Sequence, residues 1–139
     1  SYIGYIVAMR DWVEKNPDTV ERFLAARAEA DQWMRQNPEG VAEVAVRWLS
    51  GMRPEVALAA SKYNSEQLDI RKSAYNYEAL HNAQKLLYEL GFTSGTFDVN
   101  KVFMPQYIYN VMAKYPELFS DLDPIPPEAV WTPDYVFQP

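Results

Sequence analysis

The chain has 139 residues, a formal net charge of -6 and no cysteine. Its length fits one domain, and its 48% hydrophobic and 14% aromatic residues exclude general disorder because they can form a core. Without cysteine, this chain cannot form disulfides, thiol nucleophiles, iron–sulfur clusters or thiolate zinc sites, and its single histidine, His81, excludes a multi-histidine metal site. The acidic charge argues against nucleic acid as a partner.

The opening segment YIGYIVAM, residues 2–9, is β-branched and aromatic, which predicts a strand. A lone strand needs partner strands, and the rest of the sequence supplies none. The first residue is also Ser1 rather than methionine. We therefore expect the chain to be a truncated or processed product of a longer protein.

Two asparagine–proline pairs predict consecutive helices. Asn16-Pro17 places an N-cap residue before a proline at the first helical position, and apolar spacing then predicts a helix over 17–36. Asn37-Pro38 repeats this signal, and the second helix should end at Gly51.

Three further helices are expected downstream. Their starts are marked by proline or by the onset of an apolar stripe, and one of them is closed by a glycine. They are predicted from Pro54 to about Lys62, from Tyr75 or Asn76 to Gly91, and from Pro105 onward. The fold class is therefore mostly α, with one N-terminal strand.

The last part of the chain differs in composition. Residues 116–139 hold six of the ten prolines, and residues 115–139 carry five acidic residues and no basic one. This composition predicts an extended tail that lies over a surface, held by Trp131, Tyr135 and Phe137. We divide the chain into a helical portion, 1–115, and an acidic, proline-rich tail, 116–139.

No motif predicts catalysis or a resident cofactor. The five glycines form no phosphate-binding pattern, and GFTSG at 91–95 is typical of a helix end and turn rather than a nucleophile elbow. His81 has no Ser or Asp at a helical neighbour position, which favours a structural role over a general base. Asp121 and Asp123 lack the further oxygen ligands of a calcium loop.

Paired tyrosines are the best candidates for a binding site, because tyrosine joins an apolar ring to a polar tip. Tyr2 and Tyr5 lie on the predicted strand, and strand ends are where α/β folds place ligands. The alternative for each tyrosine is ordinary half-buried packing.

The order of motifs is informative. Asn16-Pro17 is followed by Val20, Phe23 and Ala26, and Trp33 is followed by Asn37-Pro38-Glu39, Ala42 and Glu43. The segment EALHNAQKLLYELGFTSGTFDVNKVF follows at 78–103. Over about residues 1–110, this order resembles the C-terminal part of ABC-transporter substrate-binding proteins, periplasmic binding proteins of the nitrate, sulfonate, taurine and thiamine-precursor group.

The resemblance implies a two-lobed α/β protein of the Venus-flytrap type, of which this chain would be the helical C-terminal part. Such a protein binds a small-molecule solute, here an organic or inorganic anion or a thiamine precursor, and passes it to an ABC permease without catalysis. It is periplasmic, or extracellular and lipid-anchored in Gram-positive bacteria, with its signal upstream of Ser1. Tyr2, Tyr5 and Arg10, at the returning strand and its end, become candidate ligand contacts.

Two features depart from the family: the other strands and the second lobe are absent, and the tail 116–139 is longer. Two alternatives therefore stay open, a self-contained helical protein–protein interaction domain and an enzyme whose catalytic residues lie in a missing half. A surface left by a missing lobe would also favour a homodimer.

Overall fold

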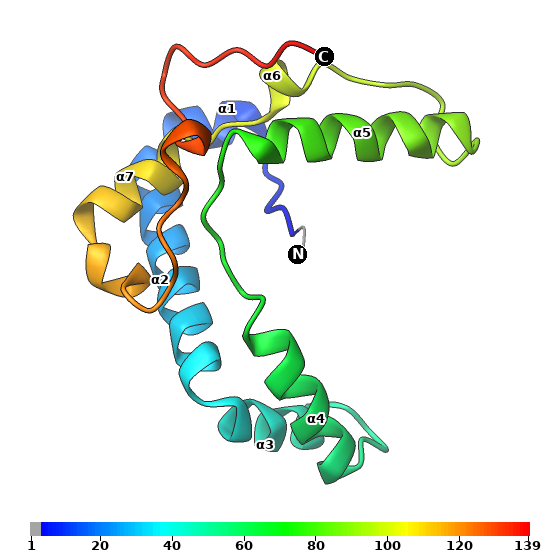
Figure 1. Ribbon diagram of the computed structural model, residues 1–139, viewed down its shortest axis with the longest axis vertical. Helices are drawn as coiled ribbons and strands as arrows, with labels where there is room; N and C mark the ends of the chain where they lie inside the picture. The colour runs from blue at the N-terminus through cyan, green and yellow to red at the C-terminus, as the bar shows by residue number, and fades with distance from the viewer. Residues whose placement is uncertain (1–3) are drawn as a thin grey trace.

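The structure is a computed structural model that describes residues 4–139, and its regular elements are all helical (Figure 1). No strand occurs among residues 4–139. The elements are α1 (Arg10–Lys15), α2 (Pro17–Gln36), α3 (Pro38–Trp48), α4 (Pro54–Ser65), α5 (Tyr75–Glu89), α6 (Val99–Val102), α7 (Gln106–Lys114), and the 3-10 helices η1 (Pro116–Phe119) and η2 (Pro127–Ala129). The mostly α prediction is confirmed.

The predicted N-terminal strand is wrong for the part of it that the structure describes. Residues 4–9 have no regular secondary structure, and α1 begins at Arg10. Strand propensity reflects packing on a sheet surface, and residues 4–139 offer no neighbouring strand to pair with. Val7 is consequently 90% exposed. Tyr2 lies outside the described residues.

The helix starts at Pro17 and Pro38 are confirmed, but the helix before Asn16, α1, was not predicted, and the expected capping by the asparagines is wrong because their side chains act on the preceding helix. Asn16 Nδ2 donates to the Trp12 carbonyl at 2.7 Å, and Asn37 Nδ2 donates to the Trp33 carbonyl at 2.9 Å. Neither side chain caps the helix that follows. Each asparagine therefore satisfies a carbonyl near the end of one helix, while the proline starts the next.

The core is small and lies where α2, α7 and η1 meet. Its buried residues are Ala28, Ile108, Val111 and Phe119. The 66–74 segment between α4 and α5 passes beside it, with Ile70 packed against it. This core fixes the positions of α2 and α7, which border the candidate site described below.

The molecule is open. Figure 1 shows α5 projecting to one side and the α3–α4 hairpin lying at the far end of α2. The chain has 9588 Å² of accessible surface, whereas a compact monomer of 16.1 kDa has about 7400 Å². Large apolar side chains remain exposed, including Trp48 at 82% and Phe92 at 75%.

The tail lies over a surface, as predicted, and it contacts α5, α6 and α7. The backbone N–H of Trp131 donates to the Tyr109 hydroxyl at 2.8 Å. Phe137 exchanges two hydrogen bonds with the Asn100 side chain, and its ring lies 5.4 Å from that of His81. The tail includes the short turns η1 and η2, and its status as a separate unit stays a prediction.

Candidate functional site

A groove of about 850 Å³ runs along the N-terminal side of the molecule. One wall comes from residues 4–8, α1 and the first half of α2, and the other from Ile70, Lys72 and the segment 97–108. Most of the lining side chains are aliphatic or aromatic. A concave, mostly apolar surface of this size is typical of small-molecule sites.

The charged side chains of this groove all have the same sign. Arg10, Lys72 and Lys101 line it, and no aspartate or glutamate is among its lining residues. This is unusual for a chain of net charge -6. Three basic residues and no acidic one among the lining favour an anion over a cation, although Arg10 also pairs with Glu14.

Lys72 is the half-buried cation of the groove. Its Nζ lies 5.7 Å from the centroid of the Tyr5 ring and donates to the carbonyls of Ile70 and Arg71 at 3.4 and 3.5 Å. Burial lowers the pKa of the Lys72 ammonium, and the charge of Asp69 opposes this shift. A partly desolvated ammonium gains more from a bound anion than one in free solvent.

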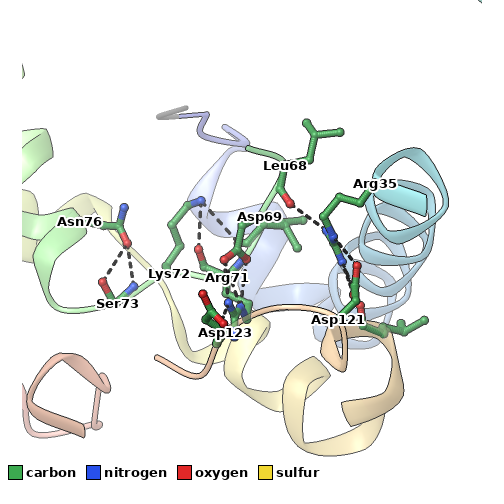
Figure 2. A network of polar contacts seen from close by, with 11 residues as sticks. Arg35, Leu68, Asp69, Arg71, Lys72, Ser73, Asn76, Asp121 and Asp123 are labelled. Atoms are coloured by element: carbon green, nitrogen blue, oxygen red, sulfur yellow. Dashed lines mark hydrogen bonds and ion pairs between the residues drawn. The ribbon is translucent and has the colours of Figure 1, made fainter. Parts of the chain in front are cut away.

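The neighbours of Lys72, Arg71 and Ser73, hold the segment around it in place. Arg71 binds the Asp69 carboxylate at 2.9–3.2 Å and donates to the Asp123 carbonyl at 2.9 Å (Figure 2). Ser73 is held by a hydrogen bond, because Asn76 Oδ1 accepts from the Ser73 N–H at 2.7 Å. These bonds hold the non-helical segment that carries Lys72.

A second, smaller cavity of about 100 Å³ shares Tyr5 and Lys72 with the groove. Asp31 and Asp69 line it, and Asp31 is only 2% exposed and pairs with Arg27 Nε at 2.8 Å. Lys72 thus lines both the groove and a cavity that carries carboxylates. The charges of Asp69 and Asp31, which line the smaller cavity and not the groove, favour its charged form.

The structure brings together two of the three residues predicted from the sequence. Tyr5 lines the groove, its hydroxyl donates to the Asn76 carbonyl at 3.3 Å, and burial raises its pKa. Arg10 lines the same groove, pairs with Glu14 at 3.4 Å and donates to the Lys101 carbonyl. Tyr2 lies outside the described residues. That Tyr5 or Arg10 binds a ligand stays a prediction.

The sequence interpretation missed Lys72 and Lys101. A signal was present for Lys72, because residues 69–72 place three charges in a stretch without helical or strand periodicity. Such a segment needs side-chain bonds to be ordered, and an ordered loop is a common location for binding residues. Nothing in the sequence connects Lys101 to residues 4–10.

Within residues 4–139, no group of three or more acidic or histidine side chains is placed to hold a metal ion. Over the same residues, no helix is both long and apolar enough to cross a membrane. His81 contacts the ring of Phe137 in the tail. The groove is thus the main chemical feature of the described part of the chain.

Comparison with known proteins adds no relative. No protein-family model matches the chain, and no curated protein and no solved structure matches it.

Proposed function

We propose that this chain is the C-terminal helical part of a substrate-binding protein of an ABC transporter. Its solute would be a small anion, of the sulfonate, nitrate or taurine kind, or a thiamine precursor. The observation that carries the proposal is the charge of the groove, which is lined by three cations and no carboxylate. The motif order from Asn16-Pro17 to residues 78–103 agrees with it.

The groove offers both a cationic group and apolar walls to an organic anion. The ammonium of Lys72 attracts the anionic group from a partly desolvated position. The ring of Tyr5 and the neighbouring apolar walls contact the rest of the solute. In this proposal the protein acts by binding alone, outside the cytoplasm, and an ABC permease receives the solute.

The groove is open to solvent, which leaves room for a second protein surface to contact the solute. Receptors of the two-lobed class complete their contacts only when a second lobe closes on the solute. Ile6 and Phe23 line the groove and are 49% and 57% exposed, so a large part of each side chain is free to be covered. Binding to this chain alone is therefore expected to be weaker than binding in a closed receptor.

The test is a titration of the chain with taurine, nitrate and a thiamine-precursor pyrimidine. Calorimetry measures binding, and intrinsic fluorescence is a second readout, to which Trp12 in the groove contributes together with three tryptophans outside it. Lys72→Met should weaken anion binding about tenfold, the loss of one charge-assisted contact. The matched control is Lys62→Met, because Lys62 lies on α4 with 57% of its side chain exposed. Equal anion affinities for the two variants, or no binding of any of the three solutes, would contradict the proposal.

One observation favours a second candidate, a helical protein–protein interaction domain. Trp48, Leu90 and Phe92 are 82%, 61% and 75% exposed, and they lie on α3 and at the end of α5, outside the groove. Light scattering across a concentration series separates the two candidates. A tight dimer that binds no anion would support the interaction domain, whereas anion binding lost in Lys72→Met would support the receptor.

The enzyme alternative has its own readout. In the same titrations, the concentration of each solute is followed over hours by chromatography. A receptor leaves the solute unchanged, and consumption of the solute by the chain would favour an enzyme on this scaffold.

A further inference from the structure

The second half of α5 projects from the molecule. Figure 1 shows this helix extending away from α2 and α7, and every residue from 85 to 98 is exposed. An isolated helix of this length is only marginally stable in water, because most helical stability in proteins comes from packing of an apolar face. Within residues 4–139, the second half of α5 therefore lacks the packing that would normally stabilise it.

One side of this half-helix is apolar. Its residues recur at i, i+3, i+4 and i+7, the spacing of a single helix face. They are Ala83, Leu86, Leu87 and Leu90, which we call the leucine face. The three leucines are 54%, 44% and 61% exposed. The charged residues of α5 all lie roughly 110° or more round the helix from the centre of this face, at about 3.6 residues per turn; they are Glu78, Lys85 and Glu89.

The turn after α5 lengthens this apolar surface. The Phe92 N–H donates to the Leu87 carbonyl at 2.9 Å, and the Gly91 N–H donates to the Tyr88 carbonyl at 3.0 Å. These two bonds form a Schellman motif, in which the residue after the glycine commonly packs on the last turn of the helix. Phe92 is 75% exposed, so the apolar surface continues past the end of α5.

The charge distribution favours a second copy of the chain as the partner of this face. A strongly charged partner would gain nothing from an uncharged surface. The tail holds five acidic residues and no basic one, so it carries most of the net charge of -6. It contacts Tyr77 and His81 in the first half of α5, and both lie more than about 120° round the helix from the leucine face. Two copies can therefore meet through this face without bringing their acidic tails together.

The exposed area is sufficient for a dimer. The accessible surface of 9588 Å² exceeds that of a compact monomer of this mass by about 2200 Å². A standard interface removes about 800 Å² from each partner. None of the leucine-face residues is among those of residues 4–139 that line the groove, so pairing through this face leaves the groove walls in place.

We propose that two copies of this chain form a symmetric dimer in which the leucine face of one copy packs against the same face of the other. The two α5 helices run antiparallel, because α5 projects from the body of each copy and a parallel pair would bring the two bodies to the same end. The contact is isologous, and Leu86 and Leu87, at the middle of the face, lie beside the two-fold axis. This inference goes beyond the proposed function and does not depend on anion binding.

The experiment measures the mass of the chain by light scattering and sedimentation over a concentration series. Leu87→Glu should raise the dissociation constant of the dimer at least about tenfold, because the two glutamates face each other across the axis. The same result is expected for Leu87→Lys. An equimolar mixture of the two variants should dimerise at least about tenfold more tightly than either variant alone, since opposite charges then meet. The matched control is Trp48→Glu, because Trp48 on α3 is 82% exposed and should not affect the dimer.

A second variant covers the case in which circular dichroism shows that the charged variants lose helix. The chain has no cysteine, so Leu87→Cys should cross-link to its own copy under mild oxidation, whereas Trp48→Cys should not. A chain that is monomeric at every concentration would overturn the proposal. So would a dimer that survives Leu87→Glu, a dimer that Trp48→Glu weakens equally, or equal cross-linking of the two cysteine variants. The anion titration is read separately: a dimer that binds no anion refutes the receptor and keeps this interface, and a monomer that binds anions does the reverse.

Discussion

The guanidinium of Arg35 binds both carboxylate oxygens of Asp121, at 2.8 and 2.9 Å, although the two residues are 86 positions apart (Figure 2). The same side chain donates to the carbonyls of Leu68 and Leu118, at 2.8 and 3.4 Å. Arg35 therefore joins the end of α2 to the 66–74 segment and to the start of the tail. Through the 66–74 segment, these contacts of Arg35 also support Lys72.

The first prediction concerns the Arg35–Asp121 pair. Asp121→Asn leaves the Arg35 guanidinium, only 8% exposed, without its charge partner. Removing one member of a buried pair is costly, so we expect a loss of about 2–4 kcal/mol in the free energy of unfolding by urea denaturation. Glu39→Gln is the control, because the Glu39–Lys62 pair is exposed on both sides and should change stability by less than about 0.5 kcal/mol. Equal losses of stability in Asp121→Asn and Glu39→Gln would contradict a stabilising role for the Arg35–Asp121 pair.

The second prediction concerns pH. Glu21 is 8% exposed and accepts hydrogen bonds from Lys114 and Asn110. The Lys114 bond is the main reason that the pKa of Glu21 falls below its ordinary value of 4.5. A carboxyl with a lowered folded-state pKa stabilises the fold above its unfolded-state pKa, and this contribution is lost as the pH falls through the folded-state pKa.

Glu21→Gln should therefore cost about 1–2 kcal/mol at pH 7 and become nearly neutral relative to the parent chain once the pH has fallen below the lowered folded-state pKa of Glu21, where both states are protonated. Urea denaturation at a series of pH values measures this. Glu43→Gln on the exposed side of α3 is the control and should show no such convergence. A pH-independent difference for Glu21→Gln would mean that the side chain acts by packing rather than by charge.

The third prediction concerns a helix end. Gly91 follows α5 with φ 78°, and no atom lies within 4 Å of a Cβ built there. Gly91→Ala should thus cost about 1 kcal/mol through backbone strain alone. Gly95→Ala is the control, because Gly95 has equal space and no positive φ. Thermal unfolding of the two variants compares them, and equal melting temperatures would refute the left-handed conformation at Gly91.

Proline and glycine explain why the helices were predictable from local sequence. Pro17 and Pro38 start helices because their missing N–H groups need no partner there, and Gly91 ends α5 because it can adopt positive φ. The segment before Arg10 was not predictable in this way. Its strand propensity needs a neighbouring strand, and the described chain contains none.

The groove could be predicted only in part, for a similar reason. Tyr5 and Arg10 were identifiable because they are close together in sequence and chemically suited to a ligand. Lys72 reaches the same groove through long-range contacts, namely Arg71 with Asp123 and Arg35 with Leu68. No local pattern encodes contacts between residues so far apart, so the positive charge of the groove became visible only in the structure.

The fourth prediction concerns the tail. The Asn100 side chain both donates to the Phe137 carbonyl, at 3.0 Å, and accepts from its N–H, at 2.9 Å. Asn100→Ala removes both bonds, so the Phe137 amide should exchange with solvent about tenfold faster. Hydrogen exchange measured by NMR tests this. Asn64→Ala on the exposed end of α4 is the control, and unchanged exchange in Asn100→Ala would refute the role of these bonds in holding the tail.

The last prediction separates binding from stability at Lys72. Burial lowers the pKa of this lysine, so at neutral pH its charged form costs free energy in the folded state. For a base with a lowered folded-state pKa, stability rises as the pH increases through the folded-state pKa toward the ordinary value of 10.5. Lys72→Met keeps an apolar stem and removes the charge. We expect its free energy of unfolding at pH 7 to equal or exceed that of the parent chain by up to about 1 kcal/mol.

The difference between Lys72→Met and the parent chain should shrink between pH 7 and pH 10, which urea denaturation at each pH measures. Lys62→Met, with 57% of the Lys62 side chain exposed, should change neither stability nor its pH dependence. A variant that binds anions poorly but unfolds no more easily than the parent chain is the pattern of a residue retained for binding. If Lys72→Met instead lost more than about 1 kcal/mol, the cation would be a structural support, since replacing a needed buried charge is destabilising.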